Sequence, residues 1–213
     1  MIALCSAFKK GLVAIKIDNK EDFFEVDANC GHSEKMLPAI DYILRKNELG
    51  LAQNESFGVV VGPGSFTGIR IAMAIVKGLC AGNDNAKKIY PITTFELMAY
   101  TYINNFHPKN NFTCIINALS GKVFACQFNM KGEKLGEEKI INSDLIEKDF
   151  VGLKEEGLTG VLVEPSAKDL LAIAMQKEKL QNPIKIENLS PMYLRKSQAE
   201  DDLEKREKNI KKI

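Results

Sequence analysis

Apolar residues follow two different spacings in the first part of the chain, and together these spacings predict a mixture of strands and helices. Short β-rich runs at residues 1–6 and 11–17 are joined by a brief turn and indicate a β-hairpin, and a third run follows at residues 23–26. From Ser33 the apolar positions recur every three or four residues, which is the spacing of an amphipathic helix. This order of elements favours an α/β protein.

The predicted helix at residues 33–46 has an unusual first turn. We expect Ser33 to cap its start, because a serine oxygen can accept a hydrogen bond from a free backbone amide there. Pro38 removes a backbone donor soon afterwards, so the first turn should be irregular and should leave His32 and Glu34 near the surface.

The stretch at residues 59–82, VVVGPGSFTGIRIAMAIVKGLCAG, is the centre of the predicted fold. Three valines form a buried strand, a turn of glycine, proline and serine follows, and an apolar segment with helical spacing comes next. A strand, a glycine-rich loop and a helix in this order bring backbone N–H groups together at a helix start, where an anion or a partner can bind. A strand at residues 87–92 and a helix at residues 95–103 follow.

The same order of elements occurs again after a polar boundary at residues 104–111. Three strands, a short helical segment, a strand and a helix are predicted, in that order, at residues 112–117, 123–128, 139–141, 143–149, 160–163 and 166–177. The repeated order indicates a duplicated architecture, although the two halves hardly resemble each other in sequence. Residues 188–196 then read as a connector, and residues 199–213 as a charged helix whose acids precede its bases.

Composition excludes several classes of protein. The formal net charge of +1 argues against a surface that coats nucleic acid or a polybasic membrane patch. The five cysteines are scattered and form no C-x-x-C pair, so neither a zinc site nor a disulfide framework is expected. Charged residues interrupt the longest apolar stretch and no leader is evident, so we expect a cytoplasmic protein without a membrane span.

The glycine-rich loop matches neither common phosphate-binding motif. It lacks the Gly-Lys-Ser/Thr ending of a Walker A loop, and Gly62, Gly64 and Gly68 are spaced as GxGxxxG rather than as G-x-G-x-x-G. These glycines and Ser65 could still contact a nucleotide or another anion. Arg70, in the first turn of the expected helix, opposes the helix dipole unless an acid balances it, either within this chain or on a partner.

Groups that could perform catalysis are scarce. A nucleotide-hydrolysing fold with this strand order would need a carboxylate at the end of its first strand, but Cys5 follows that strand and Asn117 occupies the comparable position in the second half. The two histidines form no metal-binding pair. A Cys30–His32 dyad would lack a third, orienting group, so no catalytic residue and no metal site is predicted.

Three segments resemble one known family. HSEKMLPAID at residues 32–41, VVVGPGSFTGIRIAMAIVKGL at residues 59–79 and PMYLRKSQAE at residues 191–200 resemble the TsaB family, also called YeaZ. The resemblance implies two ribonuclease-H-like lobes of the actin-like ATPase group, each a mixed five-stranded sheet with helices, followed by a charged C-terminal helix. The lobes would span residues 1–105 and 106–190, and residues 191–213 would return to the first lobe.

The resemblance also implies a function in tRNA modification. TsaB-type proteins are non-catalytic partners of a TsaD-type transferase and a TsaE-type ATPase, which form N6-threonylcarbamoyladenosine beside the anticodon in tRNAs that read codons starting with A. They also form homodimers through helices of the first lobe. ATP or ADP would bind only at the interface between different subunits, and tRNA would be contacted only indirectly.

The expected partner surface lies on the two helices of the first lobe, at residues 33–46 and 68–82. The apolar faces of these helices would form its centre, with polar groups at its margin. The predicted contacts are His32, Glu34, Met36, Leu37, Ile40, Ser65, Phe66, Thr67, Arg70, Met73 and Ala74.

The chain departs from the family at two places, and both make independent ATPase activity less expected. It has Cys5-Ser6-Ala7 where members often have Asp-Thr-Ser, and Asn117-Ala118-Leu119 where they commonly have Asp-Ala-Arg. The main alternative is an autonomous small ATPase or kinase of this fold. A protease that acts on the partner has no catalytic constellation here, and a free-standing RNA-binding module conflicts with the near-neutral charge.

Overall fold

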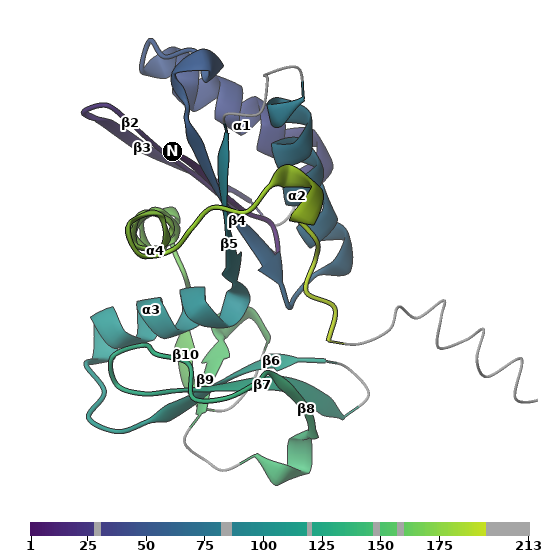
Figure 1. Ribbon diagram of the computed structural model, residues 1–213. Coiled ribbons are helices and arrows are strands. Elements are labelled where there is room, and N and C mark those ends of the chain that lie inside the picture. The colour runs from purple at the N-terminus through teal and green to yellow at the C-terminus, as the bar shows by residue number, and fades with distance from the viewer. Residues whose placement is uncertain (28–30, 82–86, 119–120, 147–149, 157–159, 195–213) are drawn as a thin grey trace, which may run out of the picture.

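The protein consists of two five-stranded sheets with helices packed between and around them (Figure 1). The computed structural model describes residues 1–27, 31–81, 87–118, 121–146, 150–156 and 160–194. Its two mixed sheets confirm the predicted fold class. Cys30 and the expected C-terminal helix at residues 199–213 lie outside the described residues.

The first sheet has the strand order β3-β2-β1-β4-β5. Its β1 and β2 form the predicted hairpin and β3 pairs antiparallel with β2, whereas β4 runs parallel to both β1 and β5. Every residue of β1 and β4 is buried, as expected for central strands covered on both faces. The strands are β1 Ile2–Cys5, β2 Gly11–Ile17, β3 Lys20–Val26, β4 Ser56–Gly62 and β5 Lys88–Thr93.

The second sheet repeats this arrangement with the order β8-β7-β6-β9-β10. As in the first sheet, the first strand lies in the middle, the next two strands extend antiparallel on one side and the last two extend parallel on the other. The strands are β6 Phe112–Asn117, β7 Lys122–Phe128, β8 Lys139–Asn142, β9 Phe150–Leu153 and β10 Val161–Val163. The arrangement of strands is therefore duplicated, although the second half lacks the predicted helix after its third strand.

Two details of the second half differ from the prediction. The strand β9 was missed, because its four residues are too few to show a strand periodicity and include a glycine. The expected helical segment at residues 143–149 is only a 3₁₀ turn, η2 Ser143–Leu145, in the part that can be described. The other short 3₁₀ turns are η1 Leu51–Gln53, η3 Lys154–Glu156 and η4 Ile186–Asn188.

The two sheets exchange helices. The helix α3 Thr94–Phe106 directly follows β5 of the first sheet but packs against β6, β9 and β10 of the second as well. The helix α4 Ala167–Leu180 follows β10 of the second sheet and packs across the first sheet, on the face opposite α1 His32–Lys46 and α2 Phe66–Cys80 (Figure 1). A Lys177–Glu96 ion pair of 2.7 Å joins α4 to α3.

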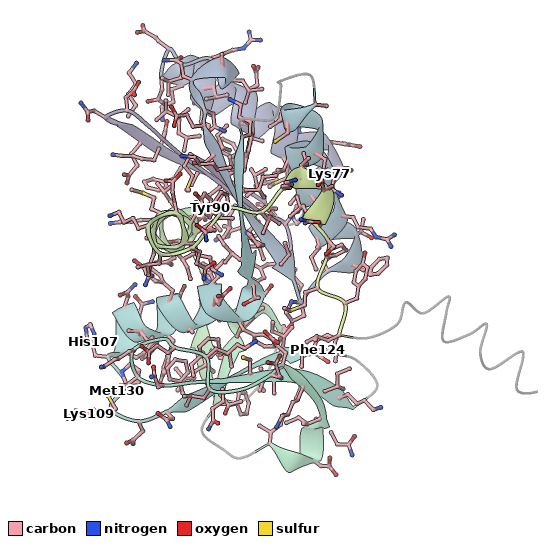
Figure 2. The ribbon with its side chains drawn as sticks, viewed as in Figure 1. Lys77, Tyr90, His107, Lys109, Phe124 and Met130 are labelled. Carbon is pink, nitrogen blue, oxygen red and sulfur yellow. The ribbon has the colours of Figure 1, made fainter. Side chains whose placement is uncertain are left out.

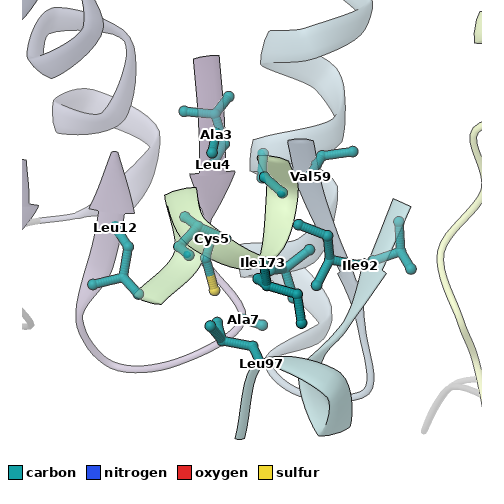
Figure 3. Close-up of a cluster of buried hydrophobic side chains, with 14 of the residues drawn as sticks. Ala3, Leu4, Cys5, Ala7, Leu12, Val59, Ile92, Leu97 and Ile173 are labelled. Carbon is teal, nitrogen blue, oxygen red and sulfur yellow. The ribbon is translucent and has the colours of Figure 1, made fainter. Parts of the chain in front are cut away.

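This exchange makes one continuous core out of the two halves. Figure 3 shows Leu97 of α3 and Ile173 of α4 in the same cluster as Leu4, Leu12 and Val59 of the first sheet. Side chains from both sheets and from the helices between them extend into the space between the sheets, with Tyr90 on the first-sheet side and Phe124 on the second (Figure 2). The second sheet also has a small separate cluster of its own, formed by Ile115, Val123, Ala125 and Phe150.

The helix starts follow simple capping chemistry, with one exception. Thr93 with Glu96 and Ser166 with Asp169 form reciprocal capping boxes at the starts of α3 and α4. The expected cap at Ser33 is wrong, because α1 begins one residue earlier and its N-cap, Gly31, has no side chain to cap it. Pro38 lies inside α1, which is an α-helix from residue 32 onward. The irregular first turn that the sequence predicted is therefore not present.

We predict that Gly58→Ala destabilises the protein even though glycine is a poor strand residue. A Cβ atom at Gly58 would lie 2.6 Å from Cβ of Ala174 on α4, so the substitution pushes this helix away from the sheet. The expected loss in the free energy of unfolding is about 1–3 kcal/mol, measured by urea denaturation. Ala174→Gly should relieve the clash, so the double variant should be more stable than the sum of the two single losses predicts, by about 0.5–3 kcal/mol. Additive losses would contradict the close packing of α4 on this sheet.

Two cysteines face each other inside the second sheet. Cys114 on β6 and Cys126 on β7 are direct partners in the antiparallel register, and both are buried. Burial raises the pKa of the Cys126 thiol to about 12 and holds the pKa of the Cys114 thiol well above its usual range. Both thiols are therefore protonated and unreactive at neutral pH.

The raised pKa values predict that the protein loses stability in alkaline solution. In the unfolded chain both thiols ionise near pH 9, but in the folded chain they stay protonated until about pH 12 for Cys126, so the unfolded state gains stability between these values. The expected loss by pH 10 is about 1.4 kcal/mol for Cys126, and Cys114 acts in the same direction. Denaturation at pH 8 and pH 10 measures it, and a Cys114→Ala/Cys126→Ala variant should show a smaller difference between the two values. An equal difference would contradict the assignment.

Candidate functional site

The loop between β4 and α2 is pressed against the turn between β1 and β2. The backbone N–H of Ser65 donates to the carbonyl of Ala7 at 2.9 Å, and the buried hydroxyl of Ser6 donates to the carbonyl of Gly68 at 2.5 Å. Ser65 caps α2, because its side-chain oxygen accepts a hydrogen bond from the N–H of Gly68 at 3.2 Å.

The loop glycines are required by this close approach. A Cβ atom at Gly68 would lie 1.7 Å from the carbonyl oxygen of Ser6, and one at Gly64 would lie 2.6 Å from that of Ala7. Gly62, with a φ of +112°, adopts a backbone conformation that other residues rarely tolerate. The glycines thus serve packing within the chain, and the N–H groups of Ser65 and Gly68 already have partners in it. Contact of Gly62, Gly64, Ser65 and Gly68 with an anion stays a prediction.

A connector after α4 covers the other side of the loop. Met192 donates its backbone N–H to the carbonyl of Val61 at 2.8 Å. A Cβ atom added at Gly62 would lie 3.1 Å from the carbonyl oxygen of Met192. Leu189 anchors the connector, since its side chain is buried in the core. The segment at residues 189–194 therefore ends beside the start of α2.

Arg70 lies against two aromatic rings at this point. Its guanidinium carbon lies 3.9 Å from the centre of the Phe66 ring, and its Nε donates a 2.6 Å hydrogen bond to the hydroxyl of Tyr193. The rings of Phe66 and Tyr193 stack with their centres 4.8 Å apart. Tyr193 was missed as a site residue because nothing in its local sequence connects it to a helix start more than a hundred positions earlier.

The environment of Arg70 differs from the expectation in two ways. The helix α2 begins at Phe66, two residues before the predicted start, so Arg70 lies in its second turn rather than its first. The alternative of a salt bridge to this same chain is not realised among the residues that the structure describes, where Arg70 has no acidic partner.

The start of α1 is tied to the same turn of the hairpin. The Nε2 atom of His32 lies 2.7 Å from the carbonyl oxygen of Lys9, which makes it a hydrogen-bond donor there. Glu34 and Leu37 project outward from the helix, and Leu37 is 47% exposed. Tyr42, 54% exposed, packs edge-on against the ring of Phe24 at 5.6 Å.

The predicted partner surface is narrower than the sequence suggested. Met36, Ile40 and Met73 are at most 5% exposed, so they pack inside this chain and cannot touch a partner unless its core opens. The reason for the error is that helical spacing identifies an apolar face but not whether that face is turned inward. His32 is half-buried, and the remaining predicted residues are exposed, namely Glu34, Leu37, Ser65, Phe66, Thr67, Arg70 and Ala74.

A cleft lies between the carboxyl ends of the strands of the two sheets. It has a volume of about 580 Å³ and is lined by Phe8, Lys9, Lys10, Glu25, Asp27, Leu153, Lys154, Val163, Glu164 and Pro165. Sequence reasoning missed it, because it combines residues from both halves of the chain. In a fold of this type such a cleft is the natural place for a ligand.

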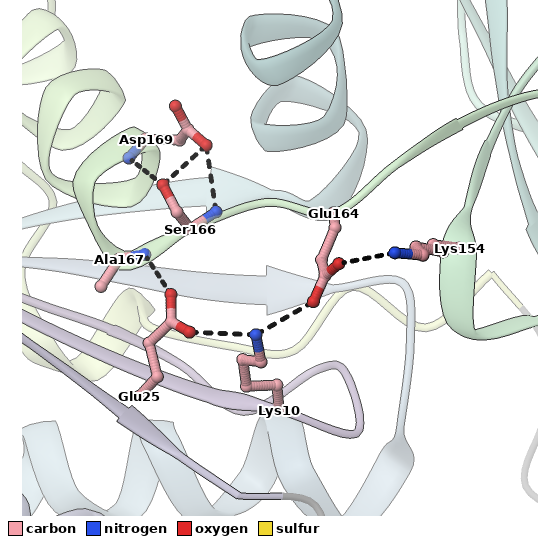
Figure 4. A network of polar contacts seen from close by, with 7 residues as sticks. All are labelled: Lys10, Glu25, Lys154, Glu164, Ser166, Ala167 and Asp169. Carbon is pink, nitrogen blue, oxygen red and sulfur yellow. Dashed lines mark hydrogen bonds and ion pairs between the residues drawn. The ribbon is translucent and has the colours of Figure 1, made fainter.

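Ion pairs cross this cleft (Figure 4). Lys10 lies 3.0 Å from both Glu25 and Glu164, and Glu164 also pairs with Lys154 at 3.5 Å. The hydrogen bond that Lys10 donates to Glu25 raises the pKa of Lys10, and the one that Lys10 donates to Glu164 lowers the pKa of Glu164. These four charges therefore neutralise one another across the two halves.

The positions that would carry catalytic acids are occupied differently. Cys5, at the end of β1, is fully buried and lies in the apolar cluster of Figure 3. Asn117 ends β6, where its backbone N–H donates to Glu156 at 3.0 Å. Across the described ranges no three His, Cys, Asp or Glu side chains gather in a way that could hold a metal ion. None of the helices in those ranges is long and apolar enough to span a bilayer.

Comparison with protein families gives one match over most of the chain. The family model described as "TsaD: tRNA N6-adenosine threonylcarbamoyltransferase" matches residues 26–157. This range includes α1, the glycine-rich loop, α2 and most of the second sheet.

Relatives with assigned names are similar over part or most of their length. A Haemophilus influenzae protein named tRNA threonylcarbamoyladenosine biosynthesis protein TsaB is 31% identical over 127 residues, which are 60% of this chain and 52% of that protein. The Escherichia coli protein of the same name is 26% identical over 196 residues, covering 79% and 82%. The chain thus spans about half the length of some of the curated relatives it matches.

Solved structures share the fold. A Pseudomonas aeruginosa crystal structure described as an uncharacterized protein with similarity to peptidase YEAZ has a TM-score of 0.77 and 20% identity, over 91% of this chain and 98% of that one. A structure of YeaZ from Pseudomonas aeruginosa covers the same shares, with a TM-score of 0.75 and 20% identity. These likenesses agree with the two-sheet architecture described above.

We predict that Gly68→Ala destabilises the protein because the added methyl group collides with the backbone of Ser6. The expected loss is about 1–3 kcal/mol in the free energy of unfolding, and it should not depend on added nucleotide. Gly78→Ala, on the same helix with no atom within 4 Å of the new Cβ, is the matched control. It should leave stability unchanged or raise it by up to about 1 kcal/mol. Equal stability of the two variants would contradict the packing of the loop on the hairpin turn.

Proposed function

The chain belongs to the TsaD family, and we propose that it takes part in the formation of N6-threonylcarbamoyladenosine in tRNA as a non-catalytic subunit. The modified base would be the adenosine next to the anticodon in tRNAs that read codons starting with A. The chain would support a TsaD-type transferase, together with a TsaE-type ATPase. Its similarity to proteins named for threonylcarbamoyladenosine biosynthesis supports this assignment.

The observation that carries the non-catalytic role is the packing at the end of β1. Cys5 occupies the place where a phosphoryl-transfer enzyme of this fold would hold a carboxylate, and it is surrounded by apolar side chains. The glycine-rich loop beside it is filled by the backbone of Ser6 and Ala7. A phosphate and its metal ion would find neither an acid nor open space at this loop.

The outer faces of α1 and α2 support a role in binding another protein. Leu37, Tyr42 and Phe66 are large apolar or aromatic side chains that are between 36% and 54% exposed. Aromatic residues and arginine contribute strongly to protein interfaces, and Arg70 lies beside Phe66. We propose this surface as the contact with the TsaD-type paralogue, and as the contact in a homodimer when that paralogue is absent. Bound ATP or ADP would then lie between the subunits, and contact with tRNA would be indirect.

The alternative of an autonomous small ATPase or kinase has one observation in its favour, the cleft between the two sheets. Its charged side chains, however, are paired with one another, and Lys10 is held by two carboxylates. A nucleotide would have to break these pairs before it could use the lysine. The interaction subunit is therefore the better supported of the two functions.

Reconstitution tests the proposed function directly. Modified tRNA should accumulate when the chain is combined with the TsaD-type and TsaE-type proteins of the same organism, and should fall sharply when the chain is omitted. Steady ATP hydrolysis by the isolated chain, or full tRNA modification without it, would contradict the proposal.

A surface variant tests the proposed interface through the affinity for the TsaD-type paralogue. Leu37→Glu should weaken binding of the TsaD-type paralogue by at least about tenfold, because it places a charge in an apolar contact. Leu135→Glu is a matched control, since Leu135 is 44% exposed but lies in the second half of the chain. Its affinity, measured by isothermal titration calorimetry, should equal that of the wild type. An equal loss in both variants would argue against a contact specific to α1.

A further inference from the structure

We propose that Tyr193 is a positioning residue that orients Arg70 to bind a carboxylate group of the partner subunit. This inference rests on the proposed function, because it concerns how the surface around α2 recognises the TsaD-type paralogue. It adds to that surface a residue from the connector, far from α2 in the sequence.

The contacts of Arg70 leave one edge of its guanidinium group available. Its Nε is engaged by the Tyr193 hydroxyl at 2.6 Å, and its planar face lies over Phe66. The two terminal nitrogens are not needed for either contact. A planar guanidinium that can donate from these two nitrogens matches the two oxygens of a carboxylate.

The electrostatic setting favours an acid as the partner group. Within the described ranges no carboxylate pairs with Arg70, whereas Lys10, Arg45, Lys46 and Lys154 near α1 and the cleft each have one. Arg70 lies in the second turn of α2, beyond the first turn to which the helix dipole is confined, so an incoming carboxylate would balance the charge of the side chain itself.

The connector holds Tyr193 in place before any partner arrives. Leu189 is buried, and Met192 is hydrogen-bonded through its N–H to Val61, so the backbone on the N-terminal side of Tyr193 is anchored. The Tyr193 ring stacks on Phe66, and its hydroxyl fixes the rotation of the arginine side chain. A long side chain that is ordered in advance loses less conformational freedom on binding, which increases affinity.

The test is a cycle of substitutions, with binding to the purified TsaD-type paralogue measured by isothermal titration calorimetry. Tyr193→Phe keeps the ring and removes only the hydroxyl, and it should weaken binding roughly three- to tenfold. Arg70→Met should weaken binding by at least about tenfold, because the carboxylate of the partner loses its counter-charge. In the Arg70→Met background, Tyr193→Phe should have no further effect. Lys77→Met, which removes an exposed cation farther along α2, is the control and should bind like the wild type.

A spectroscopic signal separates positioning from a general effect on the fold. In the free chain the Nε–H proton of Arg70 should exchange slowly with water in the wild type and quickly in Tyr193→Phe, as seen in ¹H–¹⁵N spectra. The thermal midpoint of unfolding should stay the same in both.

The outcomes distinguish this inference from the proposed function. If the wild-type chain does not bind the paralogue at all, the proposed function itself fails. If the wild type binds and Tyr193→Phe binds equally well, the positioning role of Tyr193 is overturned while the proposed function stands. A loss from Tyr193→Phe that persists in the Arg70→Met background would also overturn it, since Tyr193 would then act without the arginine.

Discussion

The exchange of α3 and α4 between the two sheets is the constraint on which the rest of the structure depends. Each sheet buries one face under a helix that the chain attaches to the other half, and the Lys177–Glu96 pair joins the two helices where they meet. Small residues make this possible, since Gly58 and Ala174 bring α4 close to the central strands. A hinge between the halves would separate these helices from the faces that they cover, so the two sheets are held in one relative orientation.

A fixed relation between the sheets explains the other features of the site. The carboxyl ends of the strands converge, which brings Lys10 and Glu164 into contact across the cleft. Within the first sheet, the parallel pairing of β1 with β4 places the hairpin turn at residues 6–10 against the glycine-rich loop. The connector that follows α4 contacts the loop on the side away from the hairpin turn and places Tyr193 beside Phe66 at the start of α2. The described part of the chain thus uses the common position of a nucleotide site for contacts with itself.

The sequence predicted the parts of this arrangement that depend on local order. The hairpin, the strand–loop–helix unit around residue 62 and the three antiparallel strands that open each half follow from periodicity and turn residues, and they agree with the structure. Features that depend on distant pairing could not be predicted. The stacking of Tyr193 on Phe66 and the ion pair between Lys10 and Glu164 join positions more than a hundred residues apart. Periodicity also could not assign Met36 or Met73 to the inside, because an apolar face looks the same whether it packs on its own sheet or on a partner.

The exchanged helices have a consequence for how the chain is made. A ribosome delivers the strands of the first sheet early, but α4, which covers one face of that sheet, emerges only after residue 167. Until then the first sheet has a bare apolar face that no later strand of the second sheet can cover. The nascent chain must therefore remain incompletely folded for most of its synthesis, and its final compaction takes place when the last part of the second half arrives. During this interval protection by cellular chaperones would matter most.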